Sequence, residues 1–350
     1  MALSVVKIDI RKLKKSELDQ FIKDHGLPKF KSNQIWEWIW KKSKTDFNEM
    51  RNLPKSLLEL LDQHFVFNPL TLDKMQKSND GTIKNRFKLH DGHFIESVLI
   101  PVPADKRFTV CVSSQVGCSL TCSFCATGKM KRIRNLDASE IYDQVVKVNQ
   151  QALEHFGLPI TNIVYMGMGE PLMNYNNVLK SVEYITSDQG LGMSPKRITV
   201  STVGLSKMIK KLADDNVKFN LALSLHAPTD TQRSQIMPIN DQNNLDSLME
   251  ALKYFYEKTQ NRISYEYISL KGVNDSIQDA QNLKHLTRFF PVKVNIIEYN
   301  TIDGVEFEKS NSINVDHFAK NLRDSGVMVT VRRSRGKDID AACGQLANKG

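Results

Sequence analysis

Short apolar runs alternate with amphipathic segments along the chain from about residue 108 onward. The run 219–226 (FNLALSLH) has the length of a strand, whereas Leu245, Leu248 and Leu252 recur at the spacing of one helical face. Strands that alternate with helices predict a parallel sheet with right-handed crossovers, and a site at the carboxyl ends of the strands. No G-x-G-x-x-G fingerprint follows the first strand, so a barrel or partial barrel fits better than a dinucleotide-binding fold. The expected strands span residues 108–114, 162–167, 197–202, 219–226, 264–270, 292–299 and 327–332.

The first hundred residues follow other patterns and predict two further units. Residues 1–70 contain three amphipathic segments and read as an N-terminal helical accessory domain. Residues 71–103 hold two β-rich segments around Asp91–Gly92, a strong hairpin signal, and read as a small β linker. The barrel then covers residues 104–350.

The composition is that of an ordinary globular protein with an excess of basic residues. Hydrophobic residues make up 41% and charged residues 25% of the 350-residue chain. No apolar run approaches the ~20 residues that span a bilayer, and charges interrupt the N-terminal apolar stretch as they would not in a signal peptide. The formal net charge of +9 favours a polyanionic partner such as a nucleic acid. We therefore expect a cytoplasmic protein with no membrane partner.

Three of the five cysteines lie in one short loop, which argues for metal or redox chemistry in a reducing compartment. In VGCSLTCSFCATGKM, Cys118, Cys122 and Cys125 follow the spacing C-x3-C-x2-C. Zinc would need a fourth ligand, whereas three thiolates on a [4Fe-4S] cluster leave one iron free to bind a substrate. With Phe124 before the last cysteine, this spacing is the signature of radical S-adenosylmethionine (SAM) enzymes.

Polar groups follow several of the expected strands. The glycine-rich segment YMGMGEP ends one strand with Glu170, Ser201 ends the next, and Ser224 with His226 ends a third. The carboxyl ends of parallel strands meet at one edge of a sheet, so these groups are expected to line one ligand-binding rim.

Taken together, these motifs closely resemble those of the bacterial dual-specificity RNA adenine-C2 methyltransferases, a radical-SAM family. The resemblance runs through CVSSQVGCSLTCSFCATGKM, MGMGEPLMNY, STVGL, LALSLHAP, MPIN, GVND and GKDIDAACGQL, in that order. It implies a (β/α)6 partial TIM barrel with an N-terminal helical domain, and it assigns Cys118, Cys122 and Cys125 to the [4Fe-4S] cluster. The residues that it assigns to SAM are Gly169, Glu170, Ser201, Ser224, Leu225, His226 and Asn300.

The resemblance also implies a reaction: methylation of C2 of adenosine 2503 in 23S ribosomal RNA and of adenosine 37 in transfer RNAs. C2 has no lone pair to attack a methyl cation, so the family consumes two SAM molecules per turnover. One methylates Cys343, and the other gives a radical that activates this methyl group for addition to C2. Cys111 then resolves the covalent RNA adduct through a transient disulfide, and Glu96 matches the base that removes the C2 proton.

Two basic runs flank the expected reactive elements. KMKRIR follows the cysteine loop and RRSRGK precedes the Cys343 segment, which suggests phosphate contacts around a flipped-out adenosine. We further expect 23S rRNA and tRNA as partners, an electron donor of the flavodoxin type, and a monomer. The basic residues assigned to RNA are Lys129, Lys131, Arg132, Arg134, Arg332, Arg333 and Arg335.

Two alternatives compete with this interpretation. A sister group methylates C8 of the same adenosine, gives ribosomal antibiotic resistance and shares the cluster, both cysteines and the fold. The other is a non-catalytic RNA-binding protein with a zinc knot made by Cys111, Cys118, Cys122 and Cys125.

Overall fold

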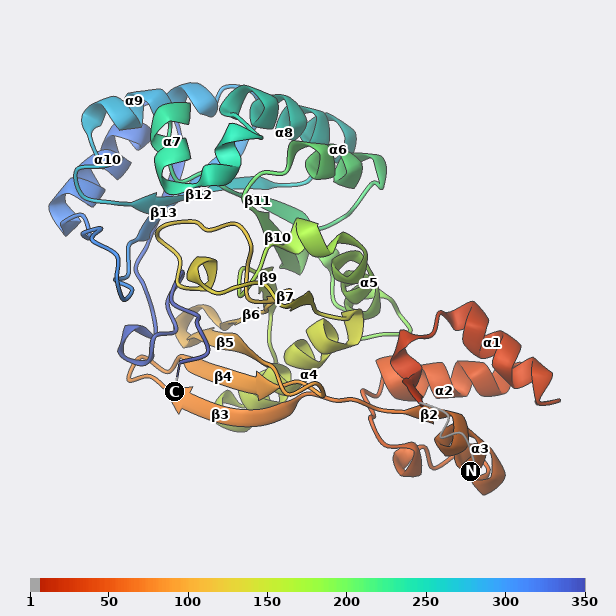
Figure 1. The fold of residues 1–350 in the computed structure, drawn as a ribbon. Coiled ribbons are helices and arrows are strands. Elements are labelled where there is room, and N and C mark those ends of the chain that lie inside the picture. The colour runs from red at the N-terminus through yellow and green to blue at the C-terminus, as the bar shows by residue number, and fades with distance from the viewer. Residues whose placement is uncertain (1–6, 350) are drawn as a thin grey trace.

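A curved ten-stranded sheet organises the protein, which is described for residues 7–349 in a computed structural model (Figure 1). Its strand order is β14-β13-β12-β11-β10-β9-β6-β5-β4-β3. From β6 to β14 all neighbours are parallel, and these are the seven strands expected from the apolar runs. The parallel strands are β6 (Arg107–Cys111), β9 (Asn162–Tyr165), β10 (Ile198–Thr202), β11 (Asn220–Ser224), β12 (Ile263–Ser269), β13 (Val292–Glu298) and β14 (Met328–Arg332).

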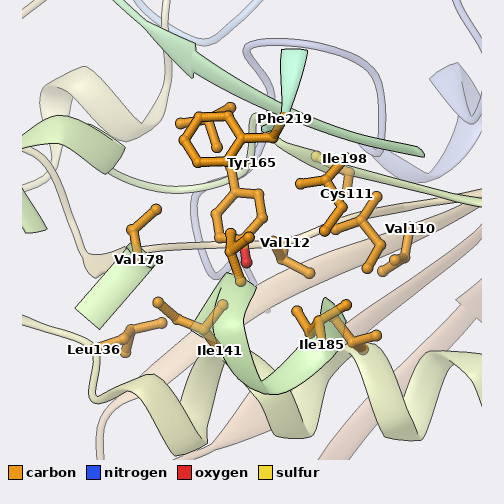
Figure 2. Packing of buried hydrophobic residues seen from close by; sticks show 14 of the residues in the cluster. Val110, Cys111, Val112, Leu136, Ile141, Tyr165, Val178, Ile185, Ile198 and Phe219 are labelled. Atoms are coloured by element: carbon orange, nitrogen blue, oxygen red, sulfur yellow. The ribbon is translucent and has the colours of Figure 1, made fainter. Parts of the chain in front are cut away.

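Helices cover the outer side of the sheet, as α8, α9 and α10 do above β11–β13 in Figure 1. Their apolar faces bury Ile141, Val178 and Ile185 against strand residues such as Tyr165, a layer seen in Figure 2. This confirms the partial-barrel fold class. The helices that follow the parallel strands are α4 (Ala138–Phe156), α5 (Tyr175–Thr186), α6 (Ser206–Asp214), α7 (Asp230–Ile236), α8 (Leu245–Thr259), α9 (Ile277–Leu286) and α10 (Ser312–Asp324).

The N-terminal domain consists of helices α1 (Lys15–Asp24), α2 (Phe30–Trp40) and α3 (Lys55–His64) and a short parallel pair, β1 (Ile8–Asp9) with β2 (Phe65–Val66). Trp40 joins it to the barrel, because its ring stacks on Tyr184 of α5 at 3.5 Å between centroids and meets Tyr142 of α4 edge-on. The buried Arg11 adds ion pairs to Asp9 and Asp143. A stacked ring and paired buried charges fix the orientation of one unit on the other. Residues 1–6 of the expected helical domain lie outside the described residues.

Residues 71–103, expected as a small linker, fold as β3 (Thr71–Lys77), β4 (Ile83–Lys88) and β5 (Phe94–Val102). The expected turn at Asp91–Gly92 joins β4 to β5 as an antiparallel hairpin. β5 also pairs with β6, so these strands extend the barrel sheet and do not form a separate sheet.

A C-terminal strap, residues 333–349, runs from β14 back to the other end of the sheet (Figure 1). Asp80, in the β3–β4 turn, accepts a hydrogen bond from the backbone N–H of Gly336 at 2.8 Å, and Ser78 donates one to Asp338 at 2.5 Å. The sheet itself remains open between β14 and β3, and the strap bridges this opening. Within residues 7–349, no helix has the length and apolar character that crossing a bilayer requires.

Candidate active site

The three-cysteine loop is closed at its base by a small antiparallel pair, β7 (Gln115–Val116) with β8 (Arg134–Asn135). Inside the loop, the backbone N–H of Cys125 donates to the carbonyl oxygen of Cys122 at 3.2 Å. Gly128 packs so closely that a Cβ there would lie 2.8 Å from the same carbonyl oxygen. A glycine at this position therefore lets the chain fold back tightly around the three thiols.

The thiols of Cys118, Cys122 and Cys125 lie close enough for their charges to interact. Burial is the first cause that raises the pKa of the Cys122 thiol, and charges on Cys125 and Cys118 raise it further. Bound iron reverses this effect, since a coordinated thiol is deprotonated. Three thiols on one short loop, with no fourth cysteine of the same loop, are the donor set that a [4Fe-4S] cluster with one open iron requires.

The zinc knot is not supported by the arrangement. A zinc knot would need Cys111 beside the three cysteines of the loop. Cys111, its expected fourth ligand, lies on β6 next to Cys343 instead.

Gly169 and Glu170 follow β9 and approach the cysteine loop. Gly169 has φ +93°, and a Cβ there would lie 2.4 Å from the Cβ of Gln115 at the start of that loop. The buried carboxylate of Glu170 accepts hydrogen bonds from the backbone N–H groups of Leu172 and Val203, each at 3.0 Å. Burial raises its pKa to about 7. Glu170 thus ties the end of β9 to the end of β10.

The side chains of Ser201 and Ser224 meet at the ends of β10 and β11, with 3.4 Å between their Oγ atoms. Leu225 is buried, and next to it His226 turns with φ +59°. The Nδ1 of His226 accepts a hydrogen bond from the backbone N–H of Ile268 at 3.1 Å, and burial lowers its pKa to about 3. The ring is therefore neutral with its proton on Nε2, where it can donate to a ligand. It also meets Phe124 of the cysteine loop edge-on at 4.7 Å.

A polar row continues from Ser224 across the sheet and was missed in the sequence. Ser224 pairs in register with Glu266, and Glu266 pairs with Asn295, whose amide donates to its carboxylate at 2.8 Å. Arg332 of β14 forms an ion pair with the same carboxylate at 3.4 Å. The sequence contains a signal for this row, because Glu266 interrupts the apolar strand SYEYISL. The alternation of side chains along a strand does not by itself show which face of the sheet binds a ligand.

Cys111 lies near enough to Cys343 for a charge on Cys343 to act on its thiol. Cys111 ends β6 and belongs with Val110 and Val112 to the buried apolar cluster that Figure 2 shows. Burial raises the pKa of the Cys111 thiol to about 12, and the neighbouring Cys343 contributes in the same direction. Cys343 is accessible to solvent, but the protein around it partly desolvates its thiol and so raises the pKa, to which a charge on Cys125 also contributes. Cys343 is thus a neighbour of both Cys111 and the cysteine loop.

The strap holds Cys343 against the cysteine loop through main-chain contacts. The backbone N–H of Ala126 donates to the carbonyl oxygen of Gly344 at 2.7 Å, and the hydroxyl of Thr127 donates to that of Leu346 at 2.5 Å. The side-chain amide of Asn300 donates to the carbonyl oxygen of Cys343 at 3.4 Å. Asn300, assigned to SAM by resemblance, therefore contacts the strap in this structure.

Glu96 is buried beneath the strap. Its carboxylate accepts hydrogen bonds from the backbone N–H groups of Ala347 and Asn348 at 2.9 and 3.1 Å. Lys84 lies 3.6 Å from it as an ion-pair partner. The carboxylate expected to act as a base thus holds the strap four to five residues beyond Cys343.

The basic residues assigned to RNA fall into two groups. Lys131 and Arg132 are exposed and line an open pocket of about 460 Å³ beside Cys118, and Arg132 also donates to Asn135 Oδ1 at 3.3 Å. The other five are held by carboxylates or carbonyl oxygens of the protein. Lys129 donates to the carbonyl oxygens of Asp303 and Gly304, Arg134 pairs with Asp91 and Glu140, Arg332 with Glu266, Arg333 with Glu298 and Asp316, and Arg335 donates to the carbonyl oxygen of Asp80.

A larger open pocket of about 890 Å³ lies between the cysteine loop and residues 304–307. Cys122, Lys129 and Phe307 are among the residues that line it. Residues of the cysteine loop thus border open space.

Comparison with known proteins agrees with this geometry. Residues 112–283 match the model of the radical SAM superfamily, and residues 8–67 match that of the ribosomal RNA large subunit methyltransferase N-terminal domain. A relative from Christiangramia forsetii, named probable dual-specificity RNA methyltransferase RlmN, is 54% identical over 98% of this chain and 97% of its own. The chain belongs to the dual-specificity RNA methyltransferase family.

Other members of this methyltransferase family match over a similar length. The probable enzyme of Salinibacter ruber is 47% identical over 98% of this chain and 95% of its own, and the dual-specificity RNA methyltransferase of Campylobacter concisus is 42% identical over 94% and 89%. A crystal structure of a radical SAM methyltransferase from Sphaerobacter thermophilus has a TM-score of 0.90 and 40% identity, covering 97% of this chain and 99% of that one. The family implies a [4Fe-4S] cluster and SAM, and the three-cysteine loop suits the former.

Proposed function

We propose that this RNA methyltransferase methylates C2 of adenosine 2503 in 23S rRNA and of adenosine 37 in tRNAs. Cys343 carries the methyl group and Cys111 releases the product. The observation that supports this most directly is that the Cys111 thiol lies near Cys343. The strap that carries Cys343 also forms hydrogen bonds with the cysteine loop. A cysteine that served only as core would have no reason to lie near a second thiol on a solvent-accessible strap.

The cluster and SAM define the radical part of the reaction. Cys118, Cys122 and Cys125 hold the cluster, which when bound supplies the electron that cleaves SAM. Gly169, Glu170, Ser201, Ser224, Leu225, His226 and Asn300 are the proposed contacts to SAM. Three of them suit this task, since His226 offers an Nε2–H donor and the Ser201–Ser224 pair offers hydroxyls at adjoining strand ends.

The thiols act in sequence. Cys343, the exposed one, first accepts a methyl group by displacement and loses its thiol proton. After the methyl carbon is joined to C2, Cys111 attacks the sulfur of Cys343: an S–S bond forms, the C–S bond breaks, and its electron pair stays with carbon, which takes up a proton. A second pair of thiols, from an external reductant, restores the two cysteines.

Glu96 is the proposed base for the C2 proton. Its carboxylate is buried and lies under the same strap as Cys343, but two backbone N–H groups occupy one of its oxygens. The proposal therefore includes a shift of residues 346–348 when RNA enters, which frees that oxygen to accept a proton.

The substrates, electron donor and assembly state complete the proposal. The RNA is bound by Lys131 and Arg132 at the loop side of the mouth, and the enzyme acts as a cytoplasmic monomer with a donor of the flavodoxin type. The exposure of both cations beside the cysteine loop supports the RNA contact.

A Cys111→Ala variant tests the two-thiol route. With RNA, SAM and a low-potential reductant under anaerobic conditions, it is expected to accumulate as a covalent protein–RNA adduct, because the resolving thiol is missing. A Cys111→Ser variant is the matched control for volume and should behave alike. Normal turnover of either variant without an adduct would contradict the route.

RNA deuterated at C2 of the target adenosine tests the position of methylation. Methylation at C2 removes the label, so mass spectrometry should find the product without deuterium. Retained deuterium would assign the methyl group to C8 and overturn the C2 proposal while leaving the two-thiol route intact.

A further inference from the structure

Arg233, on α7, is a fully buried cation that no carboxylate neutralises. Its side chain has no accessible surface, and it forms no ion pair in the part of the chain that the structure describes. The nearby carboxylate of Asp230 accepts hydrogen bonds from the side-chain amide of Asn240 and from the backbone N–H of Leu245, at 2.9 Å each. A buried guanidinium without an anion is unusual, because burial of a charge is costly unless it is paired.

Neutral acceptors surround the guanidinium on all sides. It donates to the carbonyl oxygens of Leu225 at 3.1 Å, Ser224 at 3.3 Å and Val203, which follow β11 and β10. It also donates to Asn240 Oδ1 at 2.7 Å. These contacts satisfy its hydrogen bonds and hold the strand ends of the proposed SAM site, but none of them cancels its charge.

Cys122 and Asp230 are the negative groups whose charges act on Arg233, and Cys122 lies in the cysteine loop. The helix that carries Arg233 contacts this loop directly, because Ser123 donates from its backbone N–H and its hydroxyl to the carbonyl oxygen of Ile236, at 3.0 and 3.2 Å. Ile236 also packs with Cys122 in one apolar cluster. Burial lowers the pKa of Arg233 to about 10, and a charge on Cys122 is the first influence that opposes this shift.

A cluster held by three thiolates carries net negative charge, and one-electron reduction makes it more negative without any bond change or proton uptake. A fixed positive charge in a region without water favours the more negative state. Such a charge costs no reorganisation at the moment of electron transfer, since its hydrogen bonds are already made.

We infer that the buried guanidinium of Arg233 is the counter-charge of the cluster bound by Cys118, Cys122 and Cys125, and that it raises the reduction potential of this cluster. The inference rests on the proposed cluster site. Arg233 is a positioning residue in this role, since it donates to the strand ends and to Asn240 but touches no reacting atom.

The test is a potentiometric titration, followed by electron paramagnetic resonance, of anaerobically reconstituted full-length protein with dithionite as reductant. The variants are Arg233→Gln, which removes the charge, and Arg233→Lys, which keeps it. Lys271→Gln is the control, because Lys271 is an exposed cation after β12 that pairs with Glu308 and is screened by water. Iron content and the visible spectrum are recorded first, so that failure to bind a cluster at all, which would count against the proposed function, is separated from an unchanged potential.

For Arg233→Gln, the reduction equilibrium should become at least tenfold less favourable, which for one electron is 59 mV toward negative potential. Arg233→Lys should stay close to wild type, as should Lys271→Gln. A loaded Arg233→Gln protein with the wild-type potential would overturn the inference, and so would an Arg233→Lys protein that shifts as far as the glutamine variant.

A second measurement covers poor folding of the glutamine variant. Cluster insertion should raise the melting temperature of wild type and Arg233→Lys by more than it raises that of Arg233→Met, because only the cationic side chains gain a partner. An equal rise in all three proteins would show that the cluster does not neutralise Arg233, and would reject the inference.

Discussion

The carboxylate of Glu96 accepts a hydrogen bond from the backbone N–H of Ala347 at 2.9 Å, across 251 positions of the chain. The side chain proposed to take up the C2 proton is thus also an anchor of the strap that carries Cys343, the proposed methyl acceptor. Under the proposed function Glu96 would have two tasks, and movement of the strap would decide which of them it performs.

A Glu96→Gln variant separates these tasks. Glutamine keeps an acceptor for the strap but cannot accept the C2 proton, and it leaves the buried Lys84 without its partner. We expect methylation of Cys343 to persist, whereas RNA methylation falls by about 10²-fold, the lower range for loss of a general base. Mass spectrometry of the Cys343 peptide and of the RNA in a single turnover measures both. Loss of both Cys343 methylation and RNA methylation would contradict this separation of the two tasks and would indicate that Glu96 has a purely structural role.

A Gly128→Ala variant should weaken cluster binding. The new Cβ would lie 2.8 Å from the carbonyl oxygen of Cys122, which is backbone and cannot move without displacing the thiol. Iron bound per chain after reconstitution should drop by half or more. Gly272→Ala is the control, since its Cβ meets nothing within 4 Å and the substitution adds only the strain of φ +69°. Equal iron content in both variants would show that the loop tolerates the methyl group.

The stability of the cluster-free protein should depend on pH in opposite ways through Glu170 and His226. Folding raises the pKa of Glu170 from 4.5 to about 7, so its contribution to the free energy of unfolding falls as pH rises through this window. Folding lowers the pKa of His226 from 6.5 to about 3, so its contribution rises with pH from 3 to 6.5. Each contribution changes by at most about 1.4 kcal/mol per pH unit, and the two oppose each other between pH 4.5 and 6.5.

Urea unfolding at several pH values of this window checks the assignment. As pH rises, the free energy of unfolding of Glu170→Gln should increase relative to that of wild type. The free energy of unfolding of His226→Asn should decrease relative to that of wild type. Variants whose pH slopes match that of wild type would show that neither group titrates in this way.

RNA affinity should depend on Lys131 and Arg132 more than on Arg333. The first two are exposed beside the cysteine loop, whereas Arg333 already pairs with Glu298 and Asp316. Alanine at Lys131 or Arg132 should reduce the slope of log affinity against log salt by about 0.7 to 0.9 for each phosphate that the protein no longer neutralises. Arg333→Ala should leave that slope unchanged. A larger change of the slope in Arg333→Ala would show that the second basic run also contacts RNA.

The sequence allowed the sheet to be predicted well, since all seven parallel strands are apolar runs of the kind that burial on both faces demands. The strand ends near Glu170, Ser201 and Ser224 followed from the same reasoning. The continuation of the sheet through β3–β5 did not, because a hairpin signal fixes the partner within the hairpin but not the next strand outward.

Ionic partners were the least predictable part of the site. In the sequence Arg333 is one member of a basic run. In the structure it pairs with Glu298, a carboxylate 35 positions earlier that also pairs with Lys309 and Lys337. Arg233 is the opposite case. It lies in the polar segment TDTQRSQ, a pattern typical of a surface, although its side chain is fully buried. Both cases depend on contacts between distant segments, which local patterns do not contain.

The strap also sets an order of events in folding. Its contacts to Glu96 and Asp80 join residues more than 250 positions apart, and pairings of such separation form after local ones. The small hairpin of β7 and β8 closes the cysteine loop from residues 20 positions apart, well before the strap can dock. We therefore expect an interval in which the loop has folded but the strap has not yet docked, so that iron and sulfide can reach its thiols before the strap covers them.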